Sequence, residues 1–562
     1  MSIFSQVPAT KISRSTHGLS HQVKCSFNSG PLVPIFTELS YPGDTWKVRL
    51  EQFIRTMPMI APVMDRIDVK VDAFFVPLRL IWDDFEDFIS LGPTGEFTAA
   101  RPTIYRSSVT PDSSSKADLY NGVFGVGGLA DYLRFPTNRP YQNGVQHVEE
   151  ERDALPFRAY QFIYNEYYRN ESIDPEIPVI TSSGRTNLLV TSGSPSSIQN
   201  FILRNRGWRK DYFTSALPFP QKGPAVRIPY GDIEIQADVD SNDDFKPLRL
   251  STNPDDDTPQ ALGQNEDVRG NYTTPQIPGG AKDLLFSDGT AGQFGGNSMI
   301  YKDGLRAVPS SDSLPTIEEL RYAEVLQEYY EANARGGTRY KEYLQNIWHT
   351  RSRDSRLDRP EYLGGYRGPV TITDIDQNSA SGVTPQGTLA GRGLSAGGNR
   401  LFKFRSPEFG IIMVIMSVQP KSAYYQGYRK WNLYDDVFDW PNPFFANLGE
   451  QEILNKEIYD DVSDGKNDDT FGYTPRYAEA KYIPDYVAGQ FKTTLDYWHL
   501  ARKFGSRPNL NSAFLHVDPA EVSRIFPNQV ASDDKYVGTF FFHVKRRMYL
   551  PYWGVPRLIH SI

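Results

Sequence analysis

Lysine and arginine residues gather beside aromatic residues in two short stretches of the sequence. The first stretch, RNRGWRKDYF, contains four cations: Arg204, Arg206, Arg209 and Lys210. The second, FHVKRRMYLPYWGVPRL near the C-terminus, contains another four: Lys545, Arg546, Arg547 and Arg557. Cations that bind phosphates, together with rings that stack on unpaired bases, hold single nucleic-acid strands without sequence preference. Arginine and aromatic residues are also enriched where subunits pack together, so the residue types leave both interpretations open.

A glycine-rich stretch, GRGLSAGG, has the spacing of a dinucleotide-binding fingerprint at Gly391, Gly393 and Ala396. That chemistry requires a strand before the glycines and a helix after them, so that the helix N-terminus faces the pyrophosphate. Here the pattern after the glycines predicts a strand, and no acidic residue completes a βαβ unit. We therefore interpret GRGLSAGG as a loop.

Acidic residues cluster at 83–87, 255–257 and 460–464. The second and third clusters could bind Ca²⁺, but neither continues to the closing glutamate of an EF-hand loop, which favours solvated loop charges. The first cluster could supply the paired carboxylates of a glycosidase, but its residues fall mostly on the polar side of an amphipathic helix. The acidic residues therefore predict no metal site and no catalytic pair.

Histidine and cysteine give little support to an enzyme. His17 and His21 have i, i+4 spacing, but they lie in a segment without a helical pattern. Cys25 is the only cysteine, which excludes an intrachain disulfide and a zinc site built from cysteines and fits assembly in a reducing cytoplasm. The sequence has no Gly-x-Ser-x-Gly or His-Glu-x-x-His motif. We therefore expect no catalytic residue, no metal and no cofactor.

The overall charge and composition limit the classes of protein to which the chain can belong. Its net charge is −8, so any nucleic-acid contact must be a local patch or must rely on a separate basic partner. The 44 glycines, 41 prolines, 33 tyrosines and 33 phenylalanines favour a mainly β, loop-rich protein. The longest apolar run, residues 409–418, is half of the ~20 residues that span a bilayer, which predicts a buried strand and no membrane insertion. The N-terminus lacks the apolar core of a secretory signal.

Periodic patterns predict the elements that would position these residues. Residues 65–78 alternate apolar and charged side chains, which predicts a half-buried strand. Further strands are expected at 226–239, 369–375, 401–420 and 536–551. A capping box of Thr316 and Glu319 marks the start of one helix. The helices are expected at 79–89, 155–170, 316–336 and 338–349.

Two segments differ in composition from the rest of the chain. Residues 1–60 are extended and punctuated by prolines, and we interpret them as an N-terminal arm. Residues 238–314 are rich in Asp, Asn, Gly, Pro and Thr and nearly free of large apolar runs, which predicts a surface-exposed insertion. Residues 61–562, with this insertion, are expected to form one domain.

Seven stretches of the sequence resemble, in the same order, segments of the major capsid proteins of small icosahedral single-stranded-DNA phages. They span roughly residues 65–557 and read LPFRAYQFIYNEYYRN, RKDYFTSALPFPQKGPAV, ARGGTRYKEYL, SRLDRPEYLGG, FGYTPRYAEAKY, LNSAFL and YWGVP. The family is Microviridae, and the chain is more similar to its gokushovirus branch.

The resemblance implies a mainly β fold, an eight-stranded antiparallel jelly roll of the viral capsid type with long loop insertions and a few short helices. It implies a structural protein that self-assembles, through pentamers, into a sixty-subunit T=1 icosahedral shell around a circular single-stranded DNA genome. In relatives of this kind, the insertion that corresponds to residues 238–314 builds a protrusion near each three-fold axis. That position implies a role in host attachment.

The resemblance also implies partners and a location. The partners are further copies of the chain, the single-stranded DNA genome, a small basic DNA-binding protein, an internal scaffolding protein, a pilot protein and an unidentified host surface receptor. The chain is expected in the capsid of the virion, after assembly in the cytoplasm of a bacterial host. A β-sandwich protein that binds or hydrolyses carbohydrate is the alternative, because it would also be aromatic-rich, acidic and free of disulfides.

Overall fold

The computed structural model of the 562-residue chain contains two compact units. The first comprises residues 1–222 and 331–562, and the second comprises residues 223–330. The structure describes residues 14–92, 95–96, 99–105, 123–137, 151–187, 201–227, 233–237, 249–251, 260–261, 300–303, 305–309, 316–376, 389–530 and 532–553.

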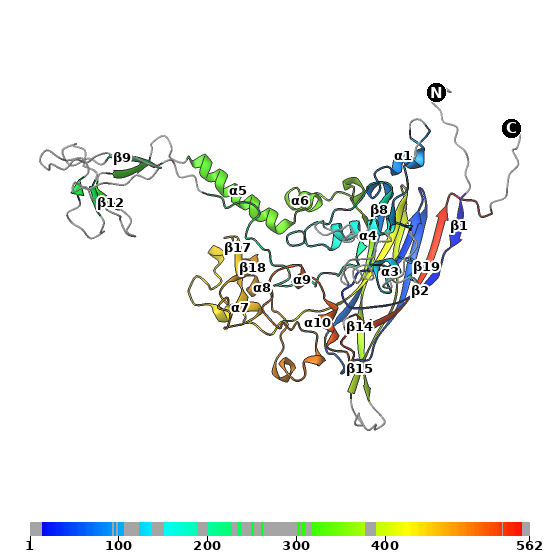
Figure 1. Cartoon of the computed structure of the whole chain (residues 1–562). Helices are drawn as coiled ribbons and strands as arrows, with labels where there is room; N and C mark the ends of the chain where they lie inside the picture. The colour runs from blue at the N-terminus through cyan, green and yellow to red at the C-terminus, as the bar shows by residue number, and fades with distance from the viewer. Residues whose placement is uncertain are drawn as a thin grey trace, which may run out of the picture. The chain divides into compact units, whose positions relative to one another are not determined.

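The first unit is built around a nine-stranded antiparallel sheet (Figure 1). Its strands are β1 (Ser15–Gly18), β2 (His21–Phe27), β3 (Val33–Ser40), β4 (Thr45–Thr56), β5 (Ile67–Pro77), β14 (Glu361–Asp376), β15 (Leu389–Arg405), β16 (Gly410–Pro420) and β19 (Tyr536–Met548). The order is β1-β19-β4-β15-β14-β5-β16-β3, and β2 also pairs with β19. Strands from opposite ends of the chain, β1 and β19, therefore lie side by side.

Strand β14 connects the two halves of the curled sheet. Residues 361–370 of β14 pair with β5, whereas residues 371–376 pair with β15. Inward side chains of β4 and β19, such as Trp46 and Phe542, share one hydrophobic cluster with Val71 of β5 and Val414 of β16. The prediction of a mainly β fold is confirmed and is consistent with a jelly roll, although the largest sheet has nine strands rather than eight.

Strands β5 and β16 are buried on both faces. One face lines the interior of the curled sheet, and the other packs against α4 (Leu155–Ile163) through residues such as Phe74 and Met413. The apolar run in β16 is therefore the buried strand that the sequence predicts. The prediction of a half-buried β5 is wrong, because Asp68 and Asp72, expected on its wet face, are 2% and 5% exposed.

Arginines from distant segments neutralise these two buried carboxylates. Arg206 donates to Asp72 at 3.2 Å, and the hydroxyl of Tyr168 donates to the same oxygen at 3.0 Å. Asp68 pairs with Arg66, which directly precedes β5, and with Arg367 of the neighbouring β14. A buried charge is tolerated only when it is paired and hydrogen-bonded, so β5 depends on these partners for its position between two layers.

Most of the expected helices are confirmed. Besides α4, which continues as a single π-helical turn over Tyr164–Tyr168, they are α5 (Ile317–Gly336) and α6 (Tyr340–Ile347). The side chains of Thr316 and Glu319 form the capping box that the sequence predicts at the start of α5. Only part of 79–89 is helical, as the turn Leu78–Leu80 and α1 (Phe85–Ser90).

The remaining described elements are short. The other strands are β6 (Thr103–Tyr105), β7 (Glu151–Asp153), β8 (Arg185–Asn187), β9 (Ile233–Ala237), β10 (Arg249–Ser251), β11 (Gln260–Ala261), β12 (Ile300–Asp303), β13 (Leu305–Pro309), β17 (Glu450–Leu454) and β18 (Thr470–Pro475). The other α-helices are α3 (Leu129–Tyr132), α7 (Asn455–Ile458), α8 (Ala478–Lys481), α9 (Ser512–Leu515) and α10 (Pro519–Ser523).

Two sequence interpretations require correction. Residues 1–60 were expected to form an arm, yet β3 and β4 are integral strands of the main sheet, since alternate residues such as Trp46 fill its core. The stretch GRGLSAGG, expected to be a loop, lies within β15. A side chain at Gly393 would meet Cγ2 of Thr56 at 2.6 Å, so this glycine serves close strand packing.

The predicted insertion at 238–314 falls inside the second unit. Most of its residues lie outside the described part of the chain, so its surface exposure stays a prediction. The described strands within it are β10 to β13, and β13 pairs with β9.

Replacement of Asp72 by alanine should destabilise the first unit strongly. The change leaves the guanidinium of Arg206 buried without its carboxylate, and loss of one partner of a buried ion pair costs about 3–5 kcal/mol. Chemical denaturation of the purified, unassembled chain measures the free energy of unfolding. The matched control is Asp468→Ala, which removes an exposed partner of Lys456 and should cost less than about 1 kcal/mol. Equal losses in the two variants would contradict the structural role of Asp72.

Candidate nucleic-acid interface

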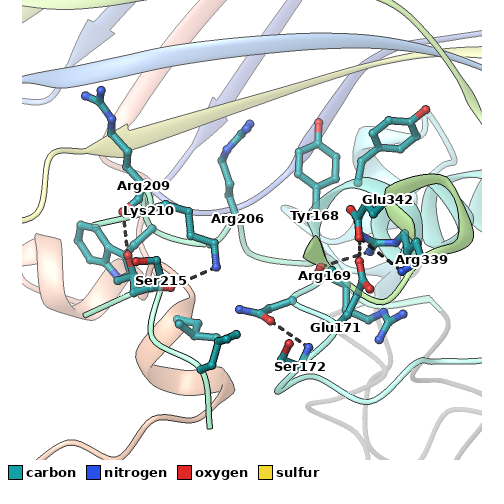
Figure 2. A pocket seen from close by; sticks show the side chains of 18 of the residues that line it. Tyr168, Arg169, Glu171, Ser172, Arg206, Arg209, Lys210, Ser215, Arg339 and Glu342 are labelled. Carbon is teal, nitrogen blue, oxygen red and sulfur yellow. Dashed lines mark hydrogen bonds and ion pairs between the residues drawn. The ribbon is translucent and has the colours of Figure 1, made fainter. Parts of the chain in front are cut away.

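The first predicted basic cluster lies at a cleft of about 960 Å³ in the first unit. Arg206, Arg209 and Lys210 line one side of this cleft, and Arg339 with its neighbouring carboxylates lies on the other (Figure 2). We call it the basic cleft, because eight lysines and arginines line it against three aspartates and glutamates. The fourth predicted residue, Arg204, lies outside the lining.

Two of the four predicted residues hold the protein together. Arg204 donates to the side chain of Gln161 at 3.3 Å and packs over the ring of Tyr164, and burial lowers the pKa of its guanidinium. Arg206 pairs with Asp72 and also donates to Ser417 at 3.0 Å. Their side chains are therefore engaged inside the protein, and a phosphate contact at Arg204 and Arg206 stays a prediction.

The other two predicted residues of this cluster are exposed. Lys210 donates to the backbone carbonyl of Thr214 at 3.1 Å, whereas Arg209 makes no side-chain hydrogen bond or ion pair among the described residues. On the far side of the cleft, Arg339 contacts both Glu171 and Glu342. Burial and the nearby carboxylate of Glu171 raise the pKa of Glu342. Much of the positive charge of the cleft is thus already neutralised by the protein.

The second predicted cluster divides between the two faces of β19. Successive residues of a strand point to opposite faces, so Lys545 and Arg547 lie exposed while Arg546 points into the protein. The Arg546 guanidinium donates from Nε to Asp44 at 2.8 Å and packs over the rings of Tyr41 and Trp46. Arg546 therefore forms a buried ion pair within the subunit, and its side chain is not exposed at the surface. Arg557 lies outside the described residues.

Lys545 belongs to a row of lysines that crosses three strands. It lies directly opposite Lys47 of β4, which in turn lies directly opposite Lys403 of β15. The neighbouring row consists of His543, Arg49 and Arg400, and the row on the other side contains Arg547 and Arg405. We call this surface the basic face, defined by seven exposed side chains: Lys47, Arg49, Arg400, Lys403, Arg405, Lys545 and Arg547.

Acidic residues offset little of this charge. Among the described residues, Glu51 is the carboxylate in contact with the basic face, at 3.2 Å from both Arg49 and His543. Like charges directly opposite each other in a sheet are destabilising, so the lysine row works against the stability of the isolated subunit. A surface that bears such an arrangement is suited to a polyanion, which would relieve the repulsion by binding phosphates between the rows.

A β-bulge keeps the basic face continuous. The register between β15 and β4 shifts between Arg400 and Phe402, which inserts the buried Leu401 as an extra residue. Without this shift, strict alternation would place Arg400 and Lys403 on opposite faces of the sheet. The bulge therefore brings both cations to the same exposed surface, opposite Arg49 and Lys47.

Aromatic rings lie at the edge of the basic face. The guanidinium of Arg14 stacks over the ring of Tyr549 at 3.6 Å. Loss of hydration and the nearby positive charges of Arg405 and Arg547 lower the pKa of Arg14. Tyr552 stacks against His17 with 5.3 Å between ring centroids, and Trp553 beside it is 77% exposed. Exposed rings next to cations supply the two contacts that an unpaired strand requires.

The sequence predictions included Lys545 and Arg547 but not the other five cations of the basic face. The signal was present in TWKVRLEQFIRT, where Lys47 and Arg49 alternate with Trp46, Val48 and Leu50. This alternation was not recognised, because residues 1–60 were interpreted as an arm.

Of the residues that the structure describes, no group of three or more His, Cys, Asp and Glu side chains could hold a metal ion. No described helix is long and apolar enough to cross a bilayer.

Comparison with known proteins identifies the family. A family model described as "Capsid protein (F protein)" matches residues 5–558. The chain belongs to this capsid-protein family. It is 32% identical to capsid protein VP1 of Chlamydia phage 1 over 99% of this chain and 97% of the relative. It is 33% identical to capsid protein VP1 of Bdellovibrio phage phiMH2K, over 98% and 97% of the two chains. Identity to capsid protein VP1 of Spiroplasma virus 4 is 29%, over 99% and 97%.

The match confirms the resemblance to capsid proteins of Microviridae, and in particular to those of gokushoviruses. The chain is a major capsid protein of a single-stranded-DNA phage, a component of the virion, and not an enzyme. The alternative of a carbohydrate-active β-sandwich enzyme is therefore set aside. Membership also implies a shell of many copies of the chain around a genome.

Removal of the lysine row should weaken the binding of single-stranded DNA in a salt-dependent manner. Each phosphate contact on a single strand contributes about 0.7 to the slope of log K against log salt. The triple variant Lys47→Ala, Lys403→Ala, Lys545→Ala should therefore reduce this slope by about 2, as measured with a labelled oligonucleotide at several salt concentrations. The matched control is Arg209→Ala with Lys210→Ala at the basic cleft, where the slope should stay unchanged. A larger reduction of the slope in the control than in the triple variant would show that DNA binds at the basic cleft instead of at the basic face.

Proposed function

We propose that this capsid protein assembles, through pentamers, into a sixty-subunit T=1 shell around a circular single-stranded DNA genome, with the basic face turned towards the genome. The single observation that carries the orientation is the unpaired lysine row of Lys47, Lys403 and Lys545. No carboxylate of the described residues forms an ion pair with these three lysines. A packaged genome would supply a dense array of phosphates to neutralise them.

The local character of the basic face supports a division of labour with other components. A chain of net charge −8 cannot neutralise a genome by itself, because every nucleotide carries a phosphate. The basic face instead fixes a few phosphates at each subunit, and a small basic DNA-binding protein supplies the remaining positive charge. An internal scaffolding protein and a pilot protein complete the expected set of partners.

Exposed rings support contact with bases as well as with phosphates. Tyr552 and Trp553 follow β19 directly and are 63% and 77% exposed. Stacking of a base on an aromatic ring is worth about 1–3 kcal/mol and tolerates any sequence. A shell protein that packages a whole genome requires this tolerance, since different bases lie at the equivalent sites of different subunits. Arg209 and Lys210 of the basic cleft are assigned no part in this contact.

The insertion at 238–314 is proposed to attach the particle to its host. Its composition, rich in Asp, Asn, Gly, Pro and Thr, is that of a solvent-facing segment, and it falls in a compact unit of its own. Recognition sites are disproportionately found on such segments, because a rigid scaffold carries them and tolerates their variation. The proposed receptor is a molecule of the host surface.

Packaging of DNA tests the orientation of the basic face. Particles that carry Lys47→Ala, Lys403→Ala and Lys545→Ala should assemble but contain less DNA per particle, because the core side chains of β4, β15 and β19 are unchanged. The ratio of absorbance at 260 and 280 nm across a sedimentation gradient measures DNA per particle. Full DNA content in intact particles would show that the basic face does not contact the genome.

Shortening of the insertion tests host attachment separately. A variant that replaces residues 240–312 by a short Gly-Ser linker should still form shells, because the main sheet lies entirely in the other unit. Its particles should lose adsorption to host cells, as counted by infectivity that remains in the supernatant. Normal adsorption by these particles would contradict the proposed attachment role.

A further inference from the structure

A segment near β17 exposes many large apolar side chains at once. In residues 434–448, which we call the aromatic loop, five side chains are 60–92% exposed: Val437, Phe438, Trp440, Phe444 and Leu448. Single exposed apolar residues are ordinary on protein surfaces, but a contiguous group of this size marks a place where another molecule binds. Aromatic residues are the commonest anchors at the centres of protein interfaces.

Internal hydrogen bonds fix the shape of the aromatic loop. The carboxylate of Asp439 accepts the backbone N–H groups of Asp435 and Asp436, both at 3.0 Å, and these bonds lower the pKa of Asp439. The side chain of Asn442 accepts the N–H of Phe444 and caps the turn Pro443–Phe445. A segment that is ordered in this way loses little conformational entropy when it binds, which favours tight association.

The base of the aromatic loop is tied to the rest of the first unit. The hydroxyl of Tyr434 donates to Glu479 at 2.8 Å, and the other oxygen of Glu479 accepts from Gln451 of β17. The rings of Tyr434 and Trp440 pack at 5.5 Å, and those of Phe438 and Phe445 pack at 5.9 Å. The exposed rings are therefore held outwards on a rigid support instead of folding back onto the protein.

The charge of the aromatic loop indicates what it binds. Asp435, Asp436 and Asp439 give it three carboxylates and no cation, so its partner must present positive charge near an apolar surface. The basic cleft has that charge, because three of the cations that line it, Lys70, Arg209 and Lys210, make no ion pair with a described residue. Arg209 and Lys210 are exposed and follow each other in the chain, so they are the cations of the cleft that a partner can reach.

We propose that the aromatic loop of one subunit docks into the basic cleft of a second copy of the chain. Both surfaces belong to the same unit of the same chain, so the contact is heterologous: one patch meets a different patch on the next copy. Heterologous contacts close into rings when the rotation between copies permits it, which is the geometry that a shell of identical subunits requires. The rings form the apolar centre of the contact, and the aspartates face the cations.

Truncation of the most exposed ring tests the aromatic loop. Phe444 is 92% exposed, so Phe444→Ser should leave the fold and the melting temperature of the subunit unchanged. Loss of an interface anchor should reduce the yield of assembled particles about tenfold or more, as measured by gradient sedimentation and electron microscopy. The matched control is Val462→Ser, another exposed apolar residue at 85%, which should assemble normally. Normal assembly of Phe444→Ser would overturn the proposal, because the aromatic loop would then not be a contact between subunits.

A charge exchange tests the basic cleft as the receiving surface. Asp435→Lys with Asp436→Lys should reduce particle yield, and so should Arg209→Glu with Lys210→Glu. The backbone N–H groups that hold the loop survive the first pair of changes. All four changes in one chain restore opposite charges across the contact and should recover most of the yield. Failure to recover would overturn the cleft as the docking site. Variants of the basic face should lower the DNA content of intact particles, whereas variants of the aromatic loop or the basic cleft should lower the yield of particles. The two proposals can therefore fail independently.

Discussion

The packing of Trp46, Val48 and Leu50 into the core fixes the register of β4, and the rest of the surface follows from that register. Side chains alternate along a strand, so burial of these three residues forces Lys47 and Arg49 to the opposite face. A slip by one residue would exchange the two sets and expose the core. The same constraint acts on β15 and β19, and the lysines of the three strands therefore meet in one row although their charges repel.

Cations inside the subunit show the contrasting solution. Arg546 of β19 is buried and Arg206 is nearly so, and each has a carboxylate partner, Asp44 and Asp72 respectively. A cation inside the protein must be paired because its desolvation is costly, whereas an exposed cation stays hydrated and can bind an external ligand. The distinction between paired and unpaired cations therefore separates residues that hold the subunit together from residues that are available to a genome. It also explains how a protein of net charge −8 can contact DNA.

Local patterns in the sequence predicted local structure well. The apolar run of β16, the capping box at Thr316 and the spacing of α4 all describe neighbours in the chain, and each was confirmed. The partners of Asp72 could not be predicted, because Arg206 and Tyr168 lie about a hundred or more residues away and meet it only in the folded sheet. The basic face is likewise assembled from three distant strands. By contrast, the inward position of Arg546 was available from its alternation with Phe542 and Val544.

The proposed orientation of the subunit brings the basic face into contact with the packaged genome. A reconstruction of genome-filled particles tests it most directly, because it places every subunit surface relative to the DNA. Nucleic-acid density is expected along the row of Lys47, Lys403 and Lys545, on the inner surface of the shell. A reconstruction in which this row faces the outside of the particle, or lies buried against a neighbouring subunit, would contradict it.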